Sequence, residues 1–245
     1  MEILKTTFDT KIGKITCYNN DHYFYNSFKT ENPYELKMID GYLKPFIKYA
    51  KNILDIGSHI GFHSVAYSRI NPAVKIVAFE PQRMVFNLLR ENVESNSLKN
   101  VTTINAAVSN KKGTFNLSSS ISDGQNANTN IEYGTDKAFN LGGVCLGKNG
   151  EEVETITIDS LELENIDFIK IDVEGAEALV LLGGIETIKK YKPVICFESN
   201  FKTITAEMKE MFGLDDVKTP KEILQEIGYT IFADIPNENI IAIYN

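Results

Sequence analysis

Residues 52–63 read NILDIGSHIGFH, and this stretch decides the fold. It opens with an apolar run of the length of a buried strand, and Gly57 and Gly61 follow. Gly57 lets the backbone turn tightly, and Gly61 lets a following helix approach both the strand and a ligand. The free N–H groups of that helix then lie at the carboxyl end of the strand, where open α/β sheets bind ligands. The stretch predicts a strand, a ligand-binding turn and a helix.

The spacing within this stretch narrows the kind of ligand. Asp55 to Gly61 reads D-x-G-x-x-x-G, which differs from the dinucleotide fingerprint G-x-G-x-x-G and disfavours a nicotinamide dehydrogenase. An acid two residues before the first glycine suits a ligand with a positive centre and no phosphates. His59 and His63 have the i, i+4 spacing of a zinc pair. Because no glutamate base lies between them and His59 precedes the helix, we do not expect zinc.

Short apolar strands alternate with amphipathic helices along the rest of the chain, which is typical of parallel βαβ units. We expect strands at 52–56, 75–79, 101–105, 167–172 and 194–198, and helices at about 61–70, 82–96 and 175–190. Residues 1–50 form an N-terminal extension with a hairpin across Thr10-Lys11 and a helical pattern after it. The chain ends in a hairpin that closes the sheet edge. Residues 51–245 then form a single α/β domain.

A long segment at 118–152 interrupts this alternation. It is rich in Ser, Asn and Gly, has little periodicity, and exceeds an ordinary connection in length. Such loops are usually functional lids or disordered segments. We favour a lid over a substrate site.

The composition of the chain limits the kinds of partner that the protein can bind. The net charge is −8 with no Lys/Arg cluster, so nucleic acid is a poor candidate, and a neutral or polar molecule such as a sugar fits better. The three cysteines, Cys17, Cys145 and Cys196, are far apart, which favours a reducing compartment. Neither a signal peptide nor an apolar run of membrane-spanning length is apparent. We expect a cytoplasmic protein without a membrane span. The sequence does not set the oligomeric state, and a dimer is compatible with it.

Polar residues follow the next two strands as well. Glu80 ends strand 75–79, and an acid there can accept both hydroxyls of a ribose. Asn105 and Ala106 follow the third strand and can line an adenine slot. Each feature also has a plainer interpretation. Glu80 could simply end a strand before Pro81 starts the next helix, and Asn105 could be an ordinary turn residue. Their order at consecutive strand ends favours S-adenosylmethionine as the ligand.

The segments NILDIGSHIGFHSVAYS, VAFEPQRMVFNLLRENVESN, INAAVSN and IDFIKIDVEGAEALVLLGG, followed by KPVICFES, resemble the FkbM family of S-adenosylmethionine-dependent methyltransferases. The resemblance covers about Tyr34 to Asn200, and I-K-I-D-V-E-G-x-E is its most specific piece. It implies a Rossmann-like class I methyltransferase fold with a mostly parallel seven-stranded sheet and a C-terminal antiparallel hairpin strand. It also implies acceptors that are often hydroxyl groups of sugars or polyketides.

The resemblance extends to individual residues. Tyr34-Glu35 matches an aromatic-acid pair, and Asp172, Glu174 and Gly175 match the fourth-strand motif. Ser58-His59 stands where the family loop commonly has Ala-Asn, which makes His59 an unusual neighbour of the cofactor. We expect cofactor contacts from Glu35, Asp55, Gly57, Ser58, His59, Gly61, Glu80, Pro81, Asn105, Ala106 and Asp172, with the N-terminal extension capping the cofactor. His22 lies in an aromatic-rich segment of that extension, and we favour a structural role for it.

Candidate catalytic groups lie at the next strand ends. Asp172 ends one strand, Glu174 lies in its turn and Glu198 ends the neighbouring strand, so three carboxylates suggest a general base or a metal site. Oxygen ligands would suit Mg²⁺, but no dedicated ligand pattern is present, so we predict no metal ligand and leave Mg²⁺ as an alternative. His63 is either a base or a core histidine. We interpret Glu177 as an ordinary first-turn acid.

These patterns predict an O-methyltransferase acting on a hydroxyl of a sugar or glycan. Two alternatives stay open: a polyketide-like hydroxyl as acceptor, or a non-catalytic module that keeps the cofactor fold. Many N-methyltransferases have the motif N/D-P-P-Y at the end of the fourth strand. This chain has Asp-Val-Glu-Gly at that position, which argues against an N-methyltransferase.

Overall fold

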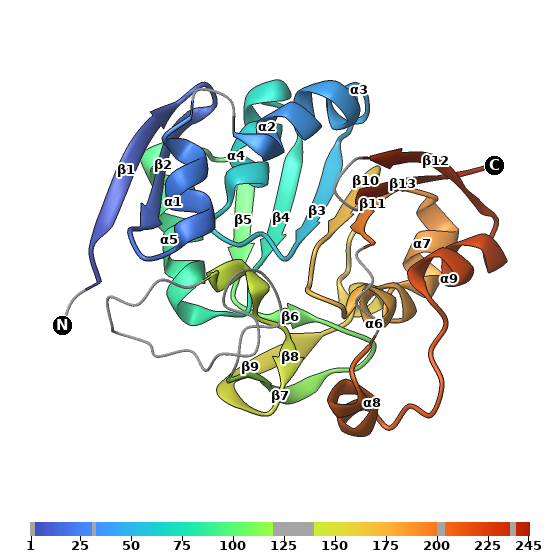
Figure 1. The fold of residues 1–245 in the computed structure, drawn as a ribbon. Coiled ribbons are helices and arrows are strands. Elements are labelled where there is room, and N and C mark those ends of the chain that lie inside the picture. Colours follow the sequence, from blue (N-terminus) through green and yellow to red (C-terminus); the bar gives the residue numbers. More distant parts are fainter. Residues whose placement is uncertain (1–2, 31–32, 120–139, 200–203, 236–238) are drawn as a thin grey trace.

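Strand β3 (Asn52–Ile56) lies inside a seven-stranded sheet with the order β12-β13-β11-β10-β3-β4-β5 (Figure 1). The computed structural model describes residues 3–30, 33–119, 140–199, 204–235 and 239–245. The other strands of this sheet are β4 (Lys75–Phe79), β5 (Val101–Ile104), β10 (Phe168–Ile171), β11 (Val194–Glu198), β12 (Tyr229–Ile235) and β13 (Asn239–Tyr244). The predicted Rossmann-like fold with a mostly parallel seven-stranded sheet is confirmed.

The C-terminal hairpin enters the sheet rather than lying beside it. Strands β5, β4, β3, β10 and β11 are parallel, and β13 is antiparallel to both of its neighbours, β11 and β12. The second strand of the hairpin is therefore inserted, and its first strand, β12, forms the edge.

Both faces of the sheet are buried, which explains the unbroken apolar strands. Leu54 and Ile56 face a core with the helices α6 (Glu177–Leu182), α7 (Ile185–Tyr191), α8 (Ala206–Phe212) and α9 (Pro220–Glu226). Ile53 belongs to the opposite core, together with α4 (Phe62–Ile70), α5 (Arg83–Ser95) and the N-terminal segment. Because successive strand residues point to opposite faces, Asp55 and Lys170 lie on the α4 side.

The predicted helix at 175–190 is two helices, α6 and α7, separated by Gly183 and Gly184. A Cβ at Gly183 would lie 1.9 Å from the backbone oxygen of Ser109. Gly183 therefore allows its backbone to pack closely against the backbone at Ser109. The apolar pattern of the sequence shows no break at this point, which is why a single helix was predicted.

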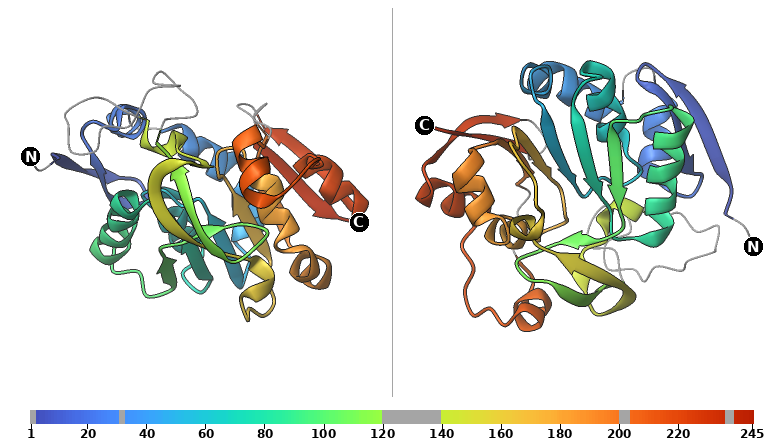
Figure 2. Two further views of the ribbon diagram at one scale, coloured as in Figure 1. Left: turned by 90° about the horizontal axis from the view of Figure 1, so that it is seen from below. Right: turned by 180° about the vertical axis from the view of Figure 1, so that it is seen from behind.

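The N-terminal extension begins with a hairpin, β1 (Lys5–Thr10) and β2 (Gly13–Tyr18), whose turn is Lys11-Ile12. The Asn92 amide of α5 donates to Thr16 O and accepts from Thr16 N, so β2 is held on α5. The elements that follow are α1 (His22–Phe28), α2 (Tyr34–Met38), a π-helix η1 (Ile39–Leu43) and α3 (Lys44–Ile47). The two chain ends lie on opposite sides of the molecule (Figure 2).

A second sheet was not predicted. Its order is β6-β9-β7-β8, formed by β6 (Ala107–Val108), β7 (Gly113–Ser118), β8 (Leu146–Gly147) and β9 (Asn149–Ile156), with short 3₁₀ turns η3 (Leu141–Gly143) and η4 (Ile158–Ser160) nearby. The expectation of irregular structure throughout 118–152 is therefore wrong at its C-terminal part. Residues 120–139 of that segment lie outside the described residues, and the lid stays a prediction. Among the helices in the described ranges, none is long and apolar enough to cross a bilayer.

Candidate active site

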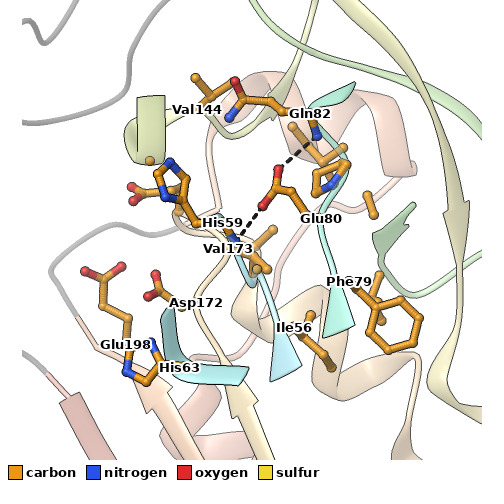
Figure 3. Close-up of a pocket in the computed structure, with 18 of the residues that line it drawn as sticks. Ile56, His59, His63, Phe79, Glu80, Gln82, Val144, Asp172, Val173 and Glu198 are labelled. Carbon is orange, nitrogen blue, oxygen red and sulfur yellow. Dashed lines mark hydrogen bonds between the residues drawn. The ribbon is translucent and has the colours of Figure 1, made fainter. Parts of the chain in front are cut away.

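A cavity of about 420 Å³ lies at the carboxyl ends of β3, β4, β10 and β11 (Figure 3). Its size is within the range of small-molecule sites. The lining comes from the N-terminal segment, the turn after β3, the segments after β4 and β5, a strap at 140–146, the turn after β10, the end of β11 and the start of β13. Of the predicted residues, the lining includes Glu35, Gly57, His59, His63, Glu80, Pro81, Ala106, Asp172, Glu174 and Glu198.

The turn after β3 is fixed from two sides. The N–H groups of Gly57 and Ser58 both donate to Phe79 O, at 3.0 and 2.9 Å. Gly57 has φ +76°, and a Cβ there would lie 1.7 Å from the backbone oxygen of Asp172. Glycine is therefore required by the packing of the turn on β10 as well as by its backbone conformation.

Ser58 and Gly61 shape this turn without lining the cavity. The Ser58 hydroxyl donates to Asp55 O at 2.7 Å, and Gly61 N donates to Ser58 O at 2.8 Å. Gly61 starts α4 with φ +85°, and a Cβ there would lie 2.5 Å from Leu89 Cδ1 in α5. Their predicted cofactor contacts stay predictions.

Asp55 is fully buried and is absent from the cavity lining. Its Oδ2 accepts a 2.6 Å hydrogen bond from the Ser64 hydroxyl in α4. Burial raises the pKa of Asp55, and the ammonium of Lys170 acts against that shift. The side chain thus links β3 to α4, and its predicted contact with the cofactor stays a prediction.

Glu80 occupies the predicted position at the end of β4. Its two carboxylate oxygens accept hydrogen bonds from His59 N at 3.0 Å and Gln82 N at 2.9 Å (Figure 3). Burial raises its pKa to about 7. The Asn105 amide donates to the backbone oxygens of Glu80 and Pro81 at 2.9 and 2.8 Å, so Asn105 supports this segment and lies outside the cavity lining.

Three carboxylates of the cavity lining lie close together. Oxygens of Asp172, Glu174 and Glu198 all lie within 4.8 Å of one another, and all three residues are partly buried. Glu174 has φ +57°, an uncommon conformation for a side-chain-bearing residue. The cluster offers hydrogen-bond acceptors for hydroxyl groups and oxygen ligands of the kind that Mg²⁺ takes.

Lys170 supports this cluster from inside the sheet. The residue is 3% exposed, and its ammonium donates to Asp172 Oδ2 at 2.9 Å and to Gly57 O at 3.3 Å. Burial disfavours the charge, but Asp172 and Asp55 outweigh that effect and raise the pKa. Sequence reasoning missed this residue, although a lysine two positions before Asp172 in an apolar strand shares its face.

Glu177 corrects a prediction. It is 3% exposed, and its Oε1 accepts from Val173 N at 3.1 Å and Gly175 N at 3.2 Å. Burial raises its pKa to about 7. It is therefore the internal brace of the turn that carries Glu174, rather than an ordinary acid on the first turn of a helix.

Two further predicted residues line the cavity with buried polar groups. His63 is 8% exposed, and burial holds its pKa well below the usual range, so the imidazole is neutral near pH 7. Glu35 accepts a 2.7 Å hydrogen bond from the Tyr23 hydroxyl, and burial raises its pKa.

Several lining residues were not predicted: Tyr23, Phe24, Met38, Gln82, Leu117, Asn140, Gly142, Val144, Leu146, Val173 and Asn239. Gln82 follows the E-P pair directly, which is the one local signal. Its amide donates to Leu141 O at 2.7 Å and so holds the strap against the segment after β4. The other residues of this list are brought to the cavity by tertiary packing.

Unsatisfied polar atoms indicate that the cavity accommodates a polar ligand. Among the described residues, buried Glu35 Oε2, His59 Nδ1 and Nε2, His63 Nε2 and Gln82 Oε1 have no hydrogen-bond partner. All four residues line this one cavity. Because buried polar groups are normally hydrogen-bonded, a ligand with amino, hydroxyl and ring-nitrogen groups fits these residues.

The sheet order, the glycine turn and the acid at the end of β4 define a methyltransferase of the S-adenosylmethionine-dependent class. Within that class, the chain belongs to the FkbM methyltransferase family: the profile described as "Methyltransferase FkbM domain" matches residues 55–230. The family resemblance of the sequence is thereby confirmed.

Two relatives lie at low identity. The methyltransferase sdnD of Sordaria araneosa is 26% identical over 187 residues, covering 66% of this chain and 68% of the relative. The 2-O-methyltransferase NoeI of Sinorhizobium fredii (strain NBRC 101917 / NGR234) is 28% identical over 154 residues, covering 56% of this chain and 59% of NoeI. The crystal structure of methyltransferase FkbM from Methylobacillus flagellatus KT matches with 14% identity and a TM-score of 0.48, over 80% of this chain and 44% of that one.

Proposed function

We propose that this protein transfers the methyl group of S-adenosylmethionine to a hydroxyl of a sugar or glycan. The observation that carries the proposal is that one cavity is lined both by the glycine turn with Glu80 and by three neighbouring carboxylates. A hydroxyl acceptor is supported by the carboxylates, which accept hydrogen bonds from hydroxyl groups. The relative NoeI is a 2-O-methyltransferase, which also favours an oxygen atom as the methyl acceptor.

The donor end of the proposed site consists of Glu35, the Gly57 turn, Glu80, Gln82 and Ala106. When bound there, S-adenosylmethionine supplies an electrophilic methyl group. Glu80 would accept hydrogen bonds from the ribose hydroxyls, and Ala106 leaves room beside it for a flat ring. The neutral imidazole of His59 and the Gln82 carbonyl add hydrogen-bonding capacity inside the cavity.

The acceptor end orients the hydroxyl and takes its proton. Holding the attacking oxygen in line accounts for much of the rate in such a displacement. Asp172 is fixed by Lys170 through one oxygen, and we assign it the orientation of the acceptor hydroxyl. The proton acceptor is one of His63, Glu174 and Glu198, each of which lines the cavity.

The test is a methyl-transfer assay with labelled S-adenosylmethionine, the full chain, and a panel of neutral glycans, free sugars, sugar nucleotides and polyketide alcohols. We expect a neutral glycan or sugar to gain one methyl group, located by mass and linkage analysis. Methyl transfer only to polyketide alcohols would show that the acceptor is a polyketide hydroxyl and not a sugar or glycan. Absence of transfer, together with no thermal stabilisation by millimolar S-adenosylhomocysteine, would favour a non-catalytic module.

Three further proposals accompany this one. We place the protein in the cytoplasm, and we assign the N-terminal extension at 1–50 the role of a cap over the donor. We propose transfer without a required metal, with Mg²⁺ at the three carboxylates as the alternative that chelation tests.

A further inference from the structure

The side chain of His59 leaves the donor turn and enters the N-terminal segment. Its ring stacks on Phe24 of α1 with a centroid distance of 4.5 Å and an interplanar angle of 22°. Its Nε2 lies 3.6 Å from Asp21 Oδ2, next to the start of α1. The Asp21 side chain is 1% exposed and that of His59 is 13% exposed, so the contact is shielded from water.

The backbone of the same residue belongs to the donor turn. His59 has φ +49°, and its N–H donates to Glu80 Oε2 at 3.0 Å. A Cβ added at Gly142 would lie 3.9 Å from His59 Nε2, so the strap also passes beside the ring. A single residue therefore joins three segments that surround the donor end: the turn, α1 and the strap.

The backbone alone does not require histidine at this position. Asparagine tolerates a left-handed φ at least as well. What histidine adds is a flat ring of the right size to stack on Phe24 and a nitrogen that faces Asp21. The side chain of His59 is thus used for contacts to the N-terminal segment, beyond what the backbone of the turn requires.

The electrostatics of the contact suit a neutral ring. Burial lowers the pKa of His59 to about 3 and raises the pKa of Asp21 to about 7. The Asp172 carboxylate and the Lys170 ammonium act on His59 in opposite directions. Stacking between an uncharged imidazole and a phenyl ring needs no ion pair, so the ring contact is the main attachment.

We propose that His59 is a positioning residue that fastens the cap, residues 21–30 and 33–35, over the donor end of the cavity, so that the turn and the cap hold the donor together. The inference rests on the proposed donor, S-adenosylmethionine. The cap contributes Tyr23, Phe24 and Glu35 to the cavity lining, and all three lie within the fastened segment. Releasing the cap therefore opens one wall of the donor site.

The first experiment measures the dissociation of S-adenosylhomocysteine by rapid mixing with the full chain. In His59→Asn and Phe24→Leu we expect dissociation to accelerate roughly tenfold, the effect of losing one aromatic stack. The double variant should be no faster than the faster single one, because both remove the same contact. Phe24→Tyr keeps the ring and should restore slow dissociation. The matched control is His22→Asn, an exposed histidine at the start of α1.

The second experiment needs no ligand: limited trypsin digestion followed at Lys29, an exposed residue directly after α1. His59→Asn should be cleaved there several times faster than the wild type and His22→Asn. Unchanged cleavage at Lys29 and unchanged dissociation of S-adenosylhomocysteine in His59→Asn would overturn the proposal that His59 fastens the cap. If the wild type does not bind S-adenosylhomocysteine, the proposed donor is wrong, and the digestion still decides whether His59 fastens the segment.

Discussion

The Lys170 ammonium lies 2.9 Å from Asp172 Oδ2 and 3.3 Å from Gly57 O, and so connects the Asp172 carboxylate to the glycine turn after β3. Lys170 stands on the face of β10 toward α4, where fully buried Asp55 is its neighbour across the sheet. One cation thus offsets the charge of two acids and holds both Asp172 and the Gly57 turn. Lys170 itself does not line the cavity.

Replacing this cation should damage stability and turnover together. In Lys170→Met, Asp55 and Asp172 lose their counter-charge, and we expect the free energy of unfolding to fall by roughly 3 kcal/mol. Urea denaturation measures the loss, and the exposed Lys75→Met is the control. Lys170→Met with Asp172→Asn should lose less than the sum of the two single changes. Strict additivity would show that the pair is not coupled.

Asp172→Asn should separate chemistry from donor binding. The amide still accepts a hydrogen bond from Lys170, so the turn is kept, but the acceptor loses a carboxylate. We expect turnover to fall about a hundredfold or more, within the range for a positioned catalytic group. The affinity for S-adenosylhomocysteine, measured by calorimetry, should stay near the wild-type value. Asp234→Asn, exposed on β12, serves as the control. Unchanged turnover would remove Asp172 from the chemistry.

Much of the sheet follows from the sequence because its strands are buried on both faces. The predicted bounds of β3, β4 and β11 match the structure residue for residue, since a continuous apolar run ends where the polar turn begins. The small sheet was missed for the opposite reason. Its strands β6 and β8 have two residues each, too few to show any period, and β7 pairs with β9 across a long sequence separation.

Some residues of the candidate site could likewise be predicted from the sequence, and others could not. Glu80, Asp172 and Glu198 were predictable because parallel strands end at one edge of the sheet, so strand ends in the sequence become neighbours in space. Glu177 was not, because its position in the first helical turn fits an exposed acid equally well. Only the folded turn places its carboxylate on two backbone N–H groups. Phe24 lies far along the sequence from the cavity's strands and carries no motif.

Chelation tests the part played by the three carboxylates. Since Lys170 already holds one oxygen of Asp172, we expect methyl transfer to persist in excess EDTA, with the charge of the cluster directed at the acceptor. The measurement is the initial rate before and after chelation, and after addition of Mg²⁺. Loss of activity in EDTA with recovery on Mg²⁺ would instead assign Asp172, Glu174 and Glu198 as a metal site. Glu198→Gln should then weaken the response to Mg²⁺.

Glu177 makes stability depend on pH in a predictable direction. Burial raises its pKa from 4.5 to about 7, so the native state binds a proton that the unfolded chain releases. Its contribution is fully present below about pH 4.5 and is lost as the pH rises through about 7. Glu177→Gln keeps an oxygen for Val173 N and Gly175 N but cannot titrate.

We therefore expect the variant to lose less stability than the wild type between pH 5 and pH 8, by on the order of 2 kcal/mol. Urea unfolding across that range measures the difference in slope. Because Glu80 and Asp21 also have raised pKa values, part of the pH dependence should survive in the variant. Parallel curves for the wild type and the variant would mean that the pKa of Glu177 is not raised in the folded protein.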